Sequence, residues 1–389
     1  MARQSVAPVP ESSFVDKGGF VEDCEPDDLI YFLLNVGDGD TQLLLLPEDP
    51  TGTRAAVVVD IATTDKLPAL LDELAATDTL LRPRQPLFEI AVATHPHQDH
   101  IGGMAQFLDR FGELVCELWE PGYYHPNGAY HEMLRALEDS AEREGGAIRH
   151  VQPTSGMRRF IGNVKITALS PAIGLRNRFD SYGVEVNNAS ISLKVEFPAS
   201  RVEQRPTERR SVRLAKTQAI ILGSDAQTMS WAQVMVDFPE LRPDESPVAE
   251  ALSLAGGSTP LRADVFKIPH HASKHGVNLE LVEMIKPSIC LVSSVGGGGS
   301  YRFPHLVAQE AVREGMEATT GTEKQRSDDH DLGIHYTSAV DSTGAPLGSM
   351  ALVMSPTGRK RRLWRFGDEA DKAVKLGEGR RCAWRDSSR

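Results

Sequence analysis

Long hydrophobic runs are missing from this chain of 389 residues. The longest, such as Leu43 to Leu46 and Ala55 to Val59, are much shorter than the roughly 18 residues that a membrane-spanning helix needs. We therefore expect no membrane contact. The segment from Met1 to Phe14 lacks the apolar core and the cleavage-like stretch of a signal peptide, and it does not resemble a transit peptide. These absences predict a cytoplasmic protein.

Cysteine and positive charge are also scarce. The four cysteines are scattered and form no CxxC pair, which argues against a disulfide framework or a cysteine-rich zinc module and fits a reducing compartment. Lys and Arg total 42 against 54 Asp and Glu, for a net charge of -12, so bulk charge cannot hold nucleic acid. Any nucleic acid would need a local basic groove or a metal. The remaining composition is ordinary for a globular protein.

The pattern of apolar residues predicts two sheets covered by helices. Residues 1–26, rich in Pro, Ser and acidic residues, are interpreted as a loose leader. Beyond them, strand hairpins are followed by helix–strand units, twice over, which is typical of a four-layer αββα sandwich. The expected strands are 30–36, 42–46, 55–60, 88–93, 115–119, 164–169, 190–197, 218–222, 264–268 and 289–293, and the expected helices are 66–76, 101–111, 129–144, 229–236, 279–285 and 305–315.

The strongest chemical signal follows the expected strand 88–93. His95, His97, Asp99 and His100 lie within six positions, and a turn after the strand would let them converge. Three imidazoles and a carboxylate are costly to bury without partners, and such nitrogen and oxygen ligands suit zinc, with manganese or iron as alternatives. A solvent-exposed polar loop is disfavoured, because the segment lies between a buried strand and a helix that opens with glycines.

Three further strands end in groups that can bind metals. Asp60 ends the strand 55–60, and Asp225 follows 218–222. His270 and His271 follow 264–268. Each residue taken alone could be a turn former, but together they predict a shared metal centre.

The run from His95 to His100, His-x-His-x-Asp-His, resembles the signature loop of the metallo-β-lactamase superfamily, and the resemblance covers roughly residues 28–310. It implies the metallo-β-lactamase αββα sandwich and two divalent ions, most readily zinc, with manganese possible. It also implies that Asp60 orients the ligands and that Asp225 bridges the two ions. On this basis residues 27–355 are predicted to be the hydrolase domain.

Further motifs are similar to those of the ComEC-like branch, without its membrane channel. They are the turn Asn35 to Asp40, the NNxS element with Asn187, Asn188 and Ser190, the segment Pro269 to Ser273 with Ala272 in place of a glycine, and Phe303 to His305. No histidine lies between His150 and Asp225, so the first ion would have His95, His97 and Asp225, completed by Asn187, Asn188 or water. The two asparagines and Ser190 could instead form turns.

The resemblance leaves two roles open. One of His270 and His271 should be a ligand; we prefer His270, with His271 as a supporting residue or as the acid that protonates the leaving group. His305 is the other candidate acid, or a helix N-terminal residue without a role. Asp99 could orient the attacking water.

The expected activity is that of a phosphodiesterase or nuclease that cleaves DNA or RNA with a metal-activated water. Lys274 and a basic hairpin insertion at 199–216, with Arg209, Arg210 and Arg213, would hold phosphates. A basic C-terminal extension at 356–389 would add Trp364 and Phe366 for base stacking, although charge runs are usually solvated surface. The alternatives are a small-molecule hydrolase (of a lactone, a phosphocholine ester or a cyclic nucleotide) and a metal-binding subunit of an assembly, with a protein partner or a second copy.

Overall fold

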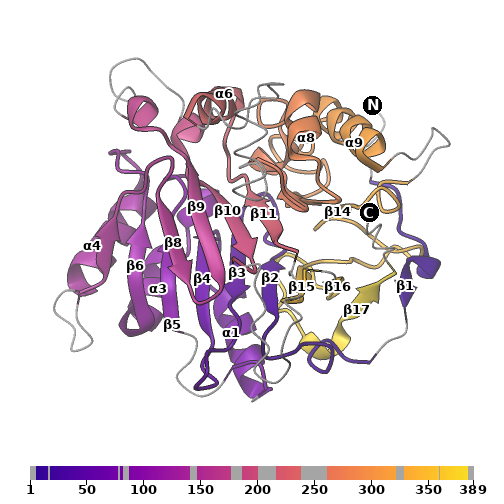
Figure 1. The fold of residues 1–389 in the computed structure, drawn as a ribbon, viewed down its shortest axis with the longest axis horizontal. Helices are drawn as coiled ribbons and strands as arrows, with labels where there is room; N and C mark the ends of the chain where they lie inside the picture. Colours follow the sequence, from indigo (N-terminus) through magenta and orange to yellow (C-terminus); the bar gives the residue numbers. More distant parts are fainter. Residues whose placement is uncertain are drawn as a thin grey trace, which may run out of the picture.

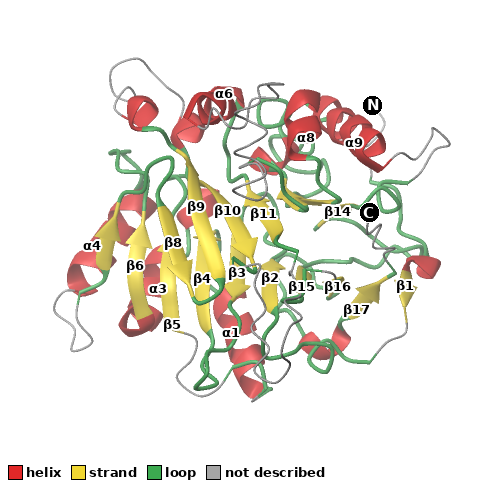
Figure 2. Ribbon diagram, in the orientation of Figure 1, coloured by secondary structure: helices red, strands yellow, loops and turns green. Residues whose placement is uncertain are grey.

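Two β-sheets face each other and carry helices on their outer faces (Figures 1 and 2). The computed structural model confirms the expected αββα sandwich. It describes residues 6–15, 18–77, 79–81, 87–140, 147–176, 186–199, 216–237, 261–320, 328–358 and 360–383.

The larger sheet has ten strands in the order β1-β17-β16-β15-β2-β3-β4-β5-β6-β7. Neighbours are antiparallel from β1 to β4 and parallel from β4 to β7. The strands are β1 (Phe14–Val15), β2 (Leu29–Leu33), β3 (Thr41–Leu45), β4 (Ala55–Ile61), β5 (Leu87–Val92), β6 (Val115–Trp119), β7 (Arg149–Val151), β15 (Met350–Met354), β16 (Arg361–Arg365) and β17 (Arg380–Cys382).

The smaller sheet has seven strands in the order β14-β13-β12-β11-β10-β9-β8. Neighbours are parallel from β11 to β14 and antiparallel elsewhere. The strands are β8 (Arg158–Ile161), β9 (Val164–Ser170), β10 (Ser192–Phe197), β11 (Gln218–Leu222), β12 (Val265–Lys267), β13 (Ile289–Val292) and β14 (Ile334–Tyr336).

The helices form the two outer layers. Among the described residues, no helix is both long and apolar enough to cross a bilayer. The helices are α1 (Lys66–Ala76), α2 (Gln98–Ile101), α3 (Met104–Phe111), α4 (Gly128–Ser140), α6 (Thr228–Asp237), α8 (Leu279–Ile285) and α9 (Leu306–Thr320), and short 3-10 turns include Val186–Ala189 and Pro269–Ala272.

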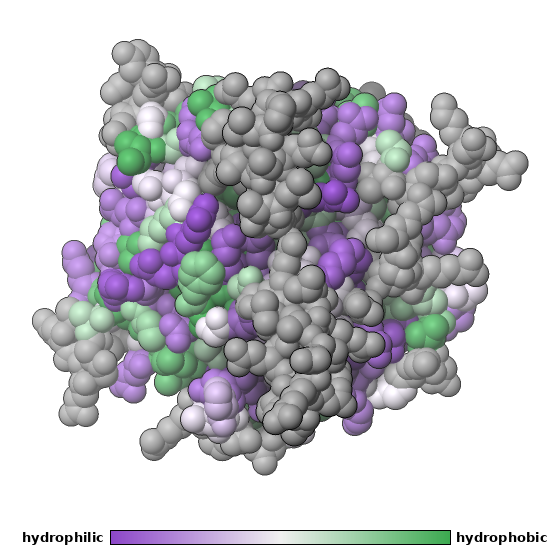
Figure 3. Space-filling model, in the orientation of Figure 1, coloured by the Kyte–Doolittle hydropathy of each residue, from purple (hydrophilic) through white to green (hydrophobic). Residues whose placement is uncertain are grey.

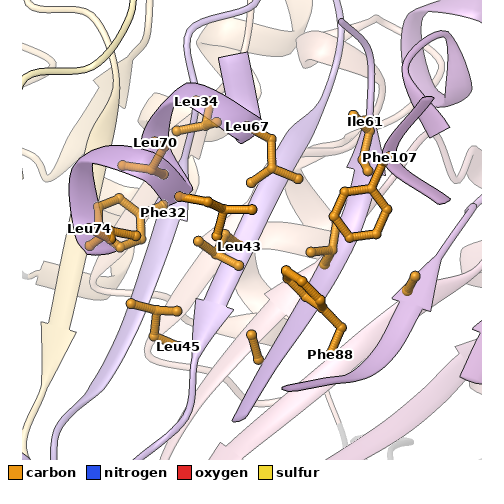
Figure 4. Close-up of a cluster of buried hydrophobic side chains, with 14 of the residues drawn as sticks. Phe32, Leu34, Leu43, Leu45, Ile61, Leu67, Leu70, Leu74, Phe88 and Phe107 are labelled. Atoms are coloured by element: carbon orange, nitrogen blue, oxygen red, sulfur yellow. The ribbon is translucent and has the colours of Figure 1, made fainter. Parts of the chain in front are cut away.

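Alternation along each strand divides the apolar residues between layers. In β2, Ile30 and Phe32 belong to the cluster under α1 and α3, which Figure 4 shows packed around Leu67, Leu70 and Phe88. The intervening residues of β2 pack against the smaller sheet, in a separate cluster between the two sheets. A third cluster lies under α6, α8 and α9. The period of two residues in the sequence thus sets which face of each strand is buried against which layer.

Most expected elements are present, with two corrections in the described residues. The helix expected at 101–111 is two helices, α2 and α3, separated at Gly102 and Gly103. Strands β1 and β8, and strands β14 to β17 beyond residue 315, were not expected. Residues 200–215, which hold Arg209, Arg210, Arg213 and nearly all of the expected basic hairpin, lie outside the described residues.

The two chain ends do not form separate appendages where the structure describes them. β1, in the expected leader, pairs with β17, and β16 pairs with β15 inside the sheet. Trp364 and Phe366 are each only 1% exposed and belong to the core under α1, so they cannot stack on bases as expected. Over the described part of one face, polar and apolar residues are interspersed (Figure 3), as is ordinary for a globular protein.

Replacing Trp364 by alanine should lower the free energy of unfolding by about 3–5 kcal/mol, because the indole is buried in the core. The matched control is Phe160→Ala, at a side chain that is 66% exposed, where we expect a change within about 0.5 kcal/mol. Denaturant unfolding measures both. Equal losses in the two variants would show that β16 does not lie inside the sheet.

Candidate metal centre

The metal-capable side chains meet because their strands end at one edge. β4 and β5 are parallel neighbours in the larger sheet, and β11 and β12 are parallel neighbours in the smaller one. Since the carboxyl ends of parallel strands share an edge, Asp60 and the 94–100 segment adjoin each other, as do Asp225 and the 269–272 turn. The facing of the two sheets then brings both pairs together.

One cluster gathers around the Oδ2 atom of Asp225. The Nε2 atom of His95 lies 3.7 Å from it and 3.1 Å from the Nδ1 atom of His97. The Nε2 atom of His270 also lies 3.7 Å from this oxygen. Two imidazoles therefore approach one carboxylate oxygen, and the third, that of His97, lies beside the first.

A second cluster gathers around the other oxygen of Asp225. The Nε2 atom of His100 lies 3.2 Å from Oδ1 and 3.9 Å from the Oδ2 atom of Asp99. The Nε2 atom of His271 lies 3.7 Å from each of the same two oxygens. Asp225 thus faces a different set of donors with each oxygen.

Both clusters fit divalent transition-metal ions. With bonds of 2.0–2.1 Å, tetrahedral ligands lie about 3.4 Å apart, and the pairs of donor atoms named above are 3.1–3.9 Å apart. The Nε2 atoms of His100 and His271 and the Oδ1 atom of Asp225 are buried and make no hydrogen bond. Because an unsatisfied buried polar atom is costly, these three atoms indicate a ligand that the described residues do not supply.

Asp60 orients His100. One oxygen accepts the Thr94 backbone N–H at 2.8 Å, and the other accepts the Thr94 hydroxyl and the Nδ1–H of His100, both at 2.7 Å. This leaves the Nε2 atom of His100 as the free nitrogen and turns it towards Asp225. A carboxylate behind a ligating imidazole fixes its tautomer and raises its basicity.

The supporting residues around His271 were not predicted. Its Nδ1–H donates to the Ser293 carbonyl at 3.0 Å, which leaves Nε2 as the free nitrogen. Asp40, fully buried, lies 4.0 Å from the same Nδ1 atom and pairs with the buried Lys267. The turn that carries Asp40 was noted in the sequence, but neither Asp40 nor Lys267 was given a role. The two residues come from different sheets, so their contact depends on how the sheets pack against each other.

Asn187 and Gln227 surround His270. The Nδ2 atom of Asn187 lies 3.4 Å from Nε2 of His270, and the Nε2 atom of Gln227 lies 3.3 Å from its Nδ1. The Oδ1 atom of Asn187 is buried without a hydrogen bond, and amide oxygens and nitrogens can exchange places. Asn187 is therefore close enough to the first cluster to complete it.

Several residues of the candidate metal centre have a strained backbone conformation. Asp60, Ser224, His270, His271 and Ala272 all have positive φ, between 46° and 62°. Residues other than glycine rarely adopt this conformation, which costs energy and concentrates at functional sites. At Ala272 it explains why related motifs carry glycine. Two successive left-handed residues also let His270 and His271 reach opposite oxygens of Asp225.

Two glycines let the histidine segment approach the end of β4. A Cβ atom on Gly103 would lie 2.3 Å from the carbonyl oxygen of Thr63, and one on Gly102 would lie 2.6 Å from that of Ala62. Any side chain would push α2 away from β4. The glycines thus keep His100 within reach of Asp60.

Burial and charge together set the protonation of the clusters. Burial and the charge of His100 hold the pKa of His95 well below its usual range, which favours the neutral, ligating imidazole. Burial opposes ionisation of Asp225, but the charges of His100 and His271 hold its pKa well below normal. Likewise, against the effect of burial, Asp225 and Asp60 raise the pKa of His100 well above normal. A bound cation would replace the protons on these imidazoles.

The other predicted residues lie in the two clusters or pack beside them. His271 lies with Asp99 and His100, and His270 lies 3.7 Å from the Oδ2 atom of Asp225, so our preference for His270 as a ligand stays a prediction. Ser190 donates to the Asn187 carbonyl at 2.7 Å and closes a turn. Asn188 lies 3.4 Å from Gln227. These two contacts are those of turn-forming and packing residues.

His305 and Lys274 lie beside the clusters. The Nδ1 atom of His305 accepts the backbone N–H of the exposed Lys274 at 3.1 Å. Its ring contacts Phe303, which in turn contacts His270 and His271. The ring of Phe303 therefore lies between His305 and the two histidines of the turn.

Comparison with known families agrees with this geometry. Residues 38–167, about a third of the chain, match the model of the metallo-β-lactamase superfamily. This match supports the similarity to the metallo-β-lactamase superfamily that the sequence motifs indicate. It includes Asp60 and the segment from His95 to His100, but it ends before Asp225 and His271. The match and the two-sheet architecture together indicate a metallo-hydrolase fold. No curated protein matches the chain.

Solved structures show distant likeness. The metallo-hydrolase Igni18 of Ignicoccus hospitalis KIN4/I is 11% identical, with a TM-score of 0.37 over 83% of this chain and 98% of that one. YhfI from Bacillus subtilis is 11% identical, with a TM-score of 0.37 over 75% and 93%. The diiron β-hydroxylase CmlA from Streptomyces venezuelae is 11% identical, with a TM-score of 0.37 over 80%, and this chain spans 53% of it. These scores are too low to indicate a shared activity.

The Asp60→Asn variant should bind metal about 10- to 100-fold more weakly, because an amide cannot accept all the hydrogen bonds that orient His100. Competition with a chromogenic chelator measures the affinity, and circular dichroism checks the fold. The matched control is Asp72→Asn, at an exposed carboxylate paired with Arg110. An unchanged affinity in a folded Asp60→Asn protein would exclude the orienting role.

Proposed function

We propose that this chain is a metal-dependent phosphodiesterase that cleaves nucleic acid with two divalent ions, zinc or manganese. The observation that carries the proposal is the position of the Asp225 carboxylate between two sets of metal-capable side chains. Each of its oxygens meets a separate donor set, with His95, His97 and His270 on one side and Asp99, His100 and His271 on the other. A carboxylate shared in this way favours two cations roughly 3.5–4 Å apart, the arrangement common in phosphoryl-transfer enzymes.

The side chains around the clusters divide the remaining tasks. When bound, the ions would supply a water of lowered pKa and neutralise charge that develops on the phosphate. The Asp99 side chain is 40% exposed, so it can orient the attacking water from the open side. His125 and His305 lie beside the cluster, and either would protonate the leaving oxygen.

Exposed aromatic rings beside the clusters favour a substrate with flat groups. Tyr301 is 71% exposed and stacks on Phe303 at 5.6 Å and 19°, and Phe303 contacts His270. Tyr124 is 63% exposed and lies next to His125, whose ring is 6.0 Å from that of His97. Stacking of bases on such rings is tolerant of sequence and would offset the lack of positive charge in the chain as a whole.

The ComEC-like branch is part of the same proposal. Two of its motif elements supply groups near the clusters, namely Asp40 from the turn and Asn187 from the NNxS element. The exposed Lys274 follows the histidine turn and would contact a phosphate. Action in the cytoplasm and the possibility of a protein partner or second copy remain part of the expectation drawn from the sequence.

Metal content tests the first step. We expect near two ions per purified chain by elemental analysis, and near one in His271→Ala, which removes a donor from only one side of Asp225. The control is His131→Ala, at an exposed histidine of α4, which should retain both ions. Metal content near zero in the unaltered protein, even after incubation with zinc or manganese, would remove the basis of the proposal.

Activity tests the second step. The metal-loaded protein should cleave single-stranded DNA or RNA, and Asp99→Ala combined with His97→Ala should lower the rate by at least about 10²–10³-fold, because the charge stabilisation is lost. Gel assays with labelled oligonucleotides measure this, with the metal restored after chelation.

A variant of the aromatic platform separates nucleic acid from smaller substrates. Tyr301→Ala should raise KM for an oligonucleotide about 5- to 150-fold and leave turnover of bis(p-nitrophenyl) phosphate unchanged. Phe160→Ala, at another exposed ring, should change neither. Turnover of chromogenic esters or lactones without cleavage of any oligonucleotide would instead support a small-molecule hydrolase.

A further inference from the structure

A second polar cluster contains a buried cation that has no ion-pair partner among the described residues. Arg365 in β16 is 2% exposed. Its guanidinium donates only to carbonyls, of Leu347 at 3.4 Å, Tyr336 at 2.7 Å and Gly348 at 3.1 Å. Within the described ranges it has no ion-pair partner. A buried charge that meets only neutral groups is costly, and burial lowers the pKa of Arg365 to about 10.

Two acidic groups nearby are paired with other cations. Asp368 pairs with Lys66 at 2.6 Å, and Asp329 pairs with Arg313 at 2.6 Å. Burial raises the pKa of the Cys382 thiol to about 11, so this group is neutral at physiological pH. Asp368 therefore compensates the positive charge of Arg365 only in part, because it is already paired with Lys66.

Two imidazoles face the same space. His330 and His335 are 8% and 3% exposed, and their rings lie 5.1 Å apart at 89°. The Nε2 atom of each is buried and makes no hydrogen bond. With Arg365 they line a small cavity of about 10 Å³, closed on another side by Val9 and bordered by the exposed Asp328. This volume holds one water-sized particle.

We propose that this cavity binds one halide-sized anion, chloride, between the guanidinium of Arg365 and the Nε2–H groups of His330 and His335. A metal ion would be repelled by the guanidinium, and a water molecule would satisfy the nitrogens but leave the guanidinium without an ion-pair partner. Chloride accepts several hydrogen bonds and neutralises the cation. The cavity shares no residue with the metal centre, so this proposal stands apart from the phosphodiesterase proposal.

The bound anion would join three parts of the fold. His335 lies in β14 of the smaller sheet, and Arg365 lies in β16 of the larger sheet (Figure 1). Val9 belongs to the N-terminal segment, where its N–H donates to the Val340 carbonyl at 2.8 Å. An anion held by these elements stabilises the folded chain and has no partner in the unfolded one.

Thermal unfolding of the full-length, metal-loaded protein tests the site. Replacing sodium gluconate with sodium chloride at constant total salt should raise Tm by about 2–4 °C, because gluconate is too large for the cavity. His335→Leu should lose this chloride-dependent rise, and the control His131→Leu should retain it. Crystals soaked in bromide should show an anomalous peak among Arg365, His330 and His335.

Each contrary result is decisive. Equal Tm values in the two salts overturn the proposal. If the bromide peak is then absent, the cavity holds water. If the peak is present, the site binds an adventitious ion only. A full chloride response in folded His335→Leu also overturns it, because the responding site would lie elsewhere. If His335→Leu does not fold, the salt comparison and the bromide peak in the unaltered protein still decide.

Discussion

The two oxygens of Asp225 organise the metal centre. The carboxylate is buried at the end of β11, and each oxygen faces imidazoles that come from both sheets. Without a cation, these buried imidazoles repel one another and several of their nitrogens make no hydrogen bond. The arrangement therefore fits a cation, which would replace the protons on these imidazoles, and the rest of the fold holds the donors in place.

The surrounding structure resists collapse of this arrangement. Asp60 fixes His100 and the Ser293 carbonyl fixes His271, each through the nitrogen that faces away from Asp225. The left-handed backbone at His270 and His271 is stable only because the residues around it determine it. Such preorganisation places the cost of assembling the site in folding rather than in metal binding or catalysis.

Local sequence predicted the parts of this site that depend on strand ends. Asp60, His95 to His100 and Asp225 each follow a short apolar run, and the position of a residue directly after a buried strand is a local property. The same reasoning left the choice between His270 and His271 open, because neighbouring residues in a turn can point either way. It failed for Trp364, whose basic flanks suggested a surface segment although the ring lies in the core.

By itself, the sequence determined the layered architecture and the set of metal-capable residues, because period-two burial and the strand-end motifs are written within a few residues of each other. Only the tertiary structure decided which histidine meets which oxygen of Asp225, that Lys267 meets Asp40, and that Arg365 lies beside His330 and His335. His270 and His271 reach Asp225 from the neighbouring strand of the same sheet, whereas the other pairings join residues from different sheets. They depend on how the two sheets face each other, and no local spacing encodes that orientation.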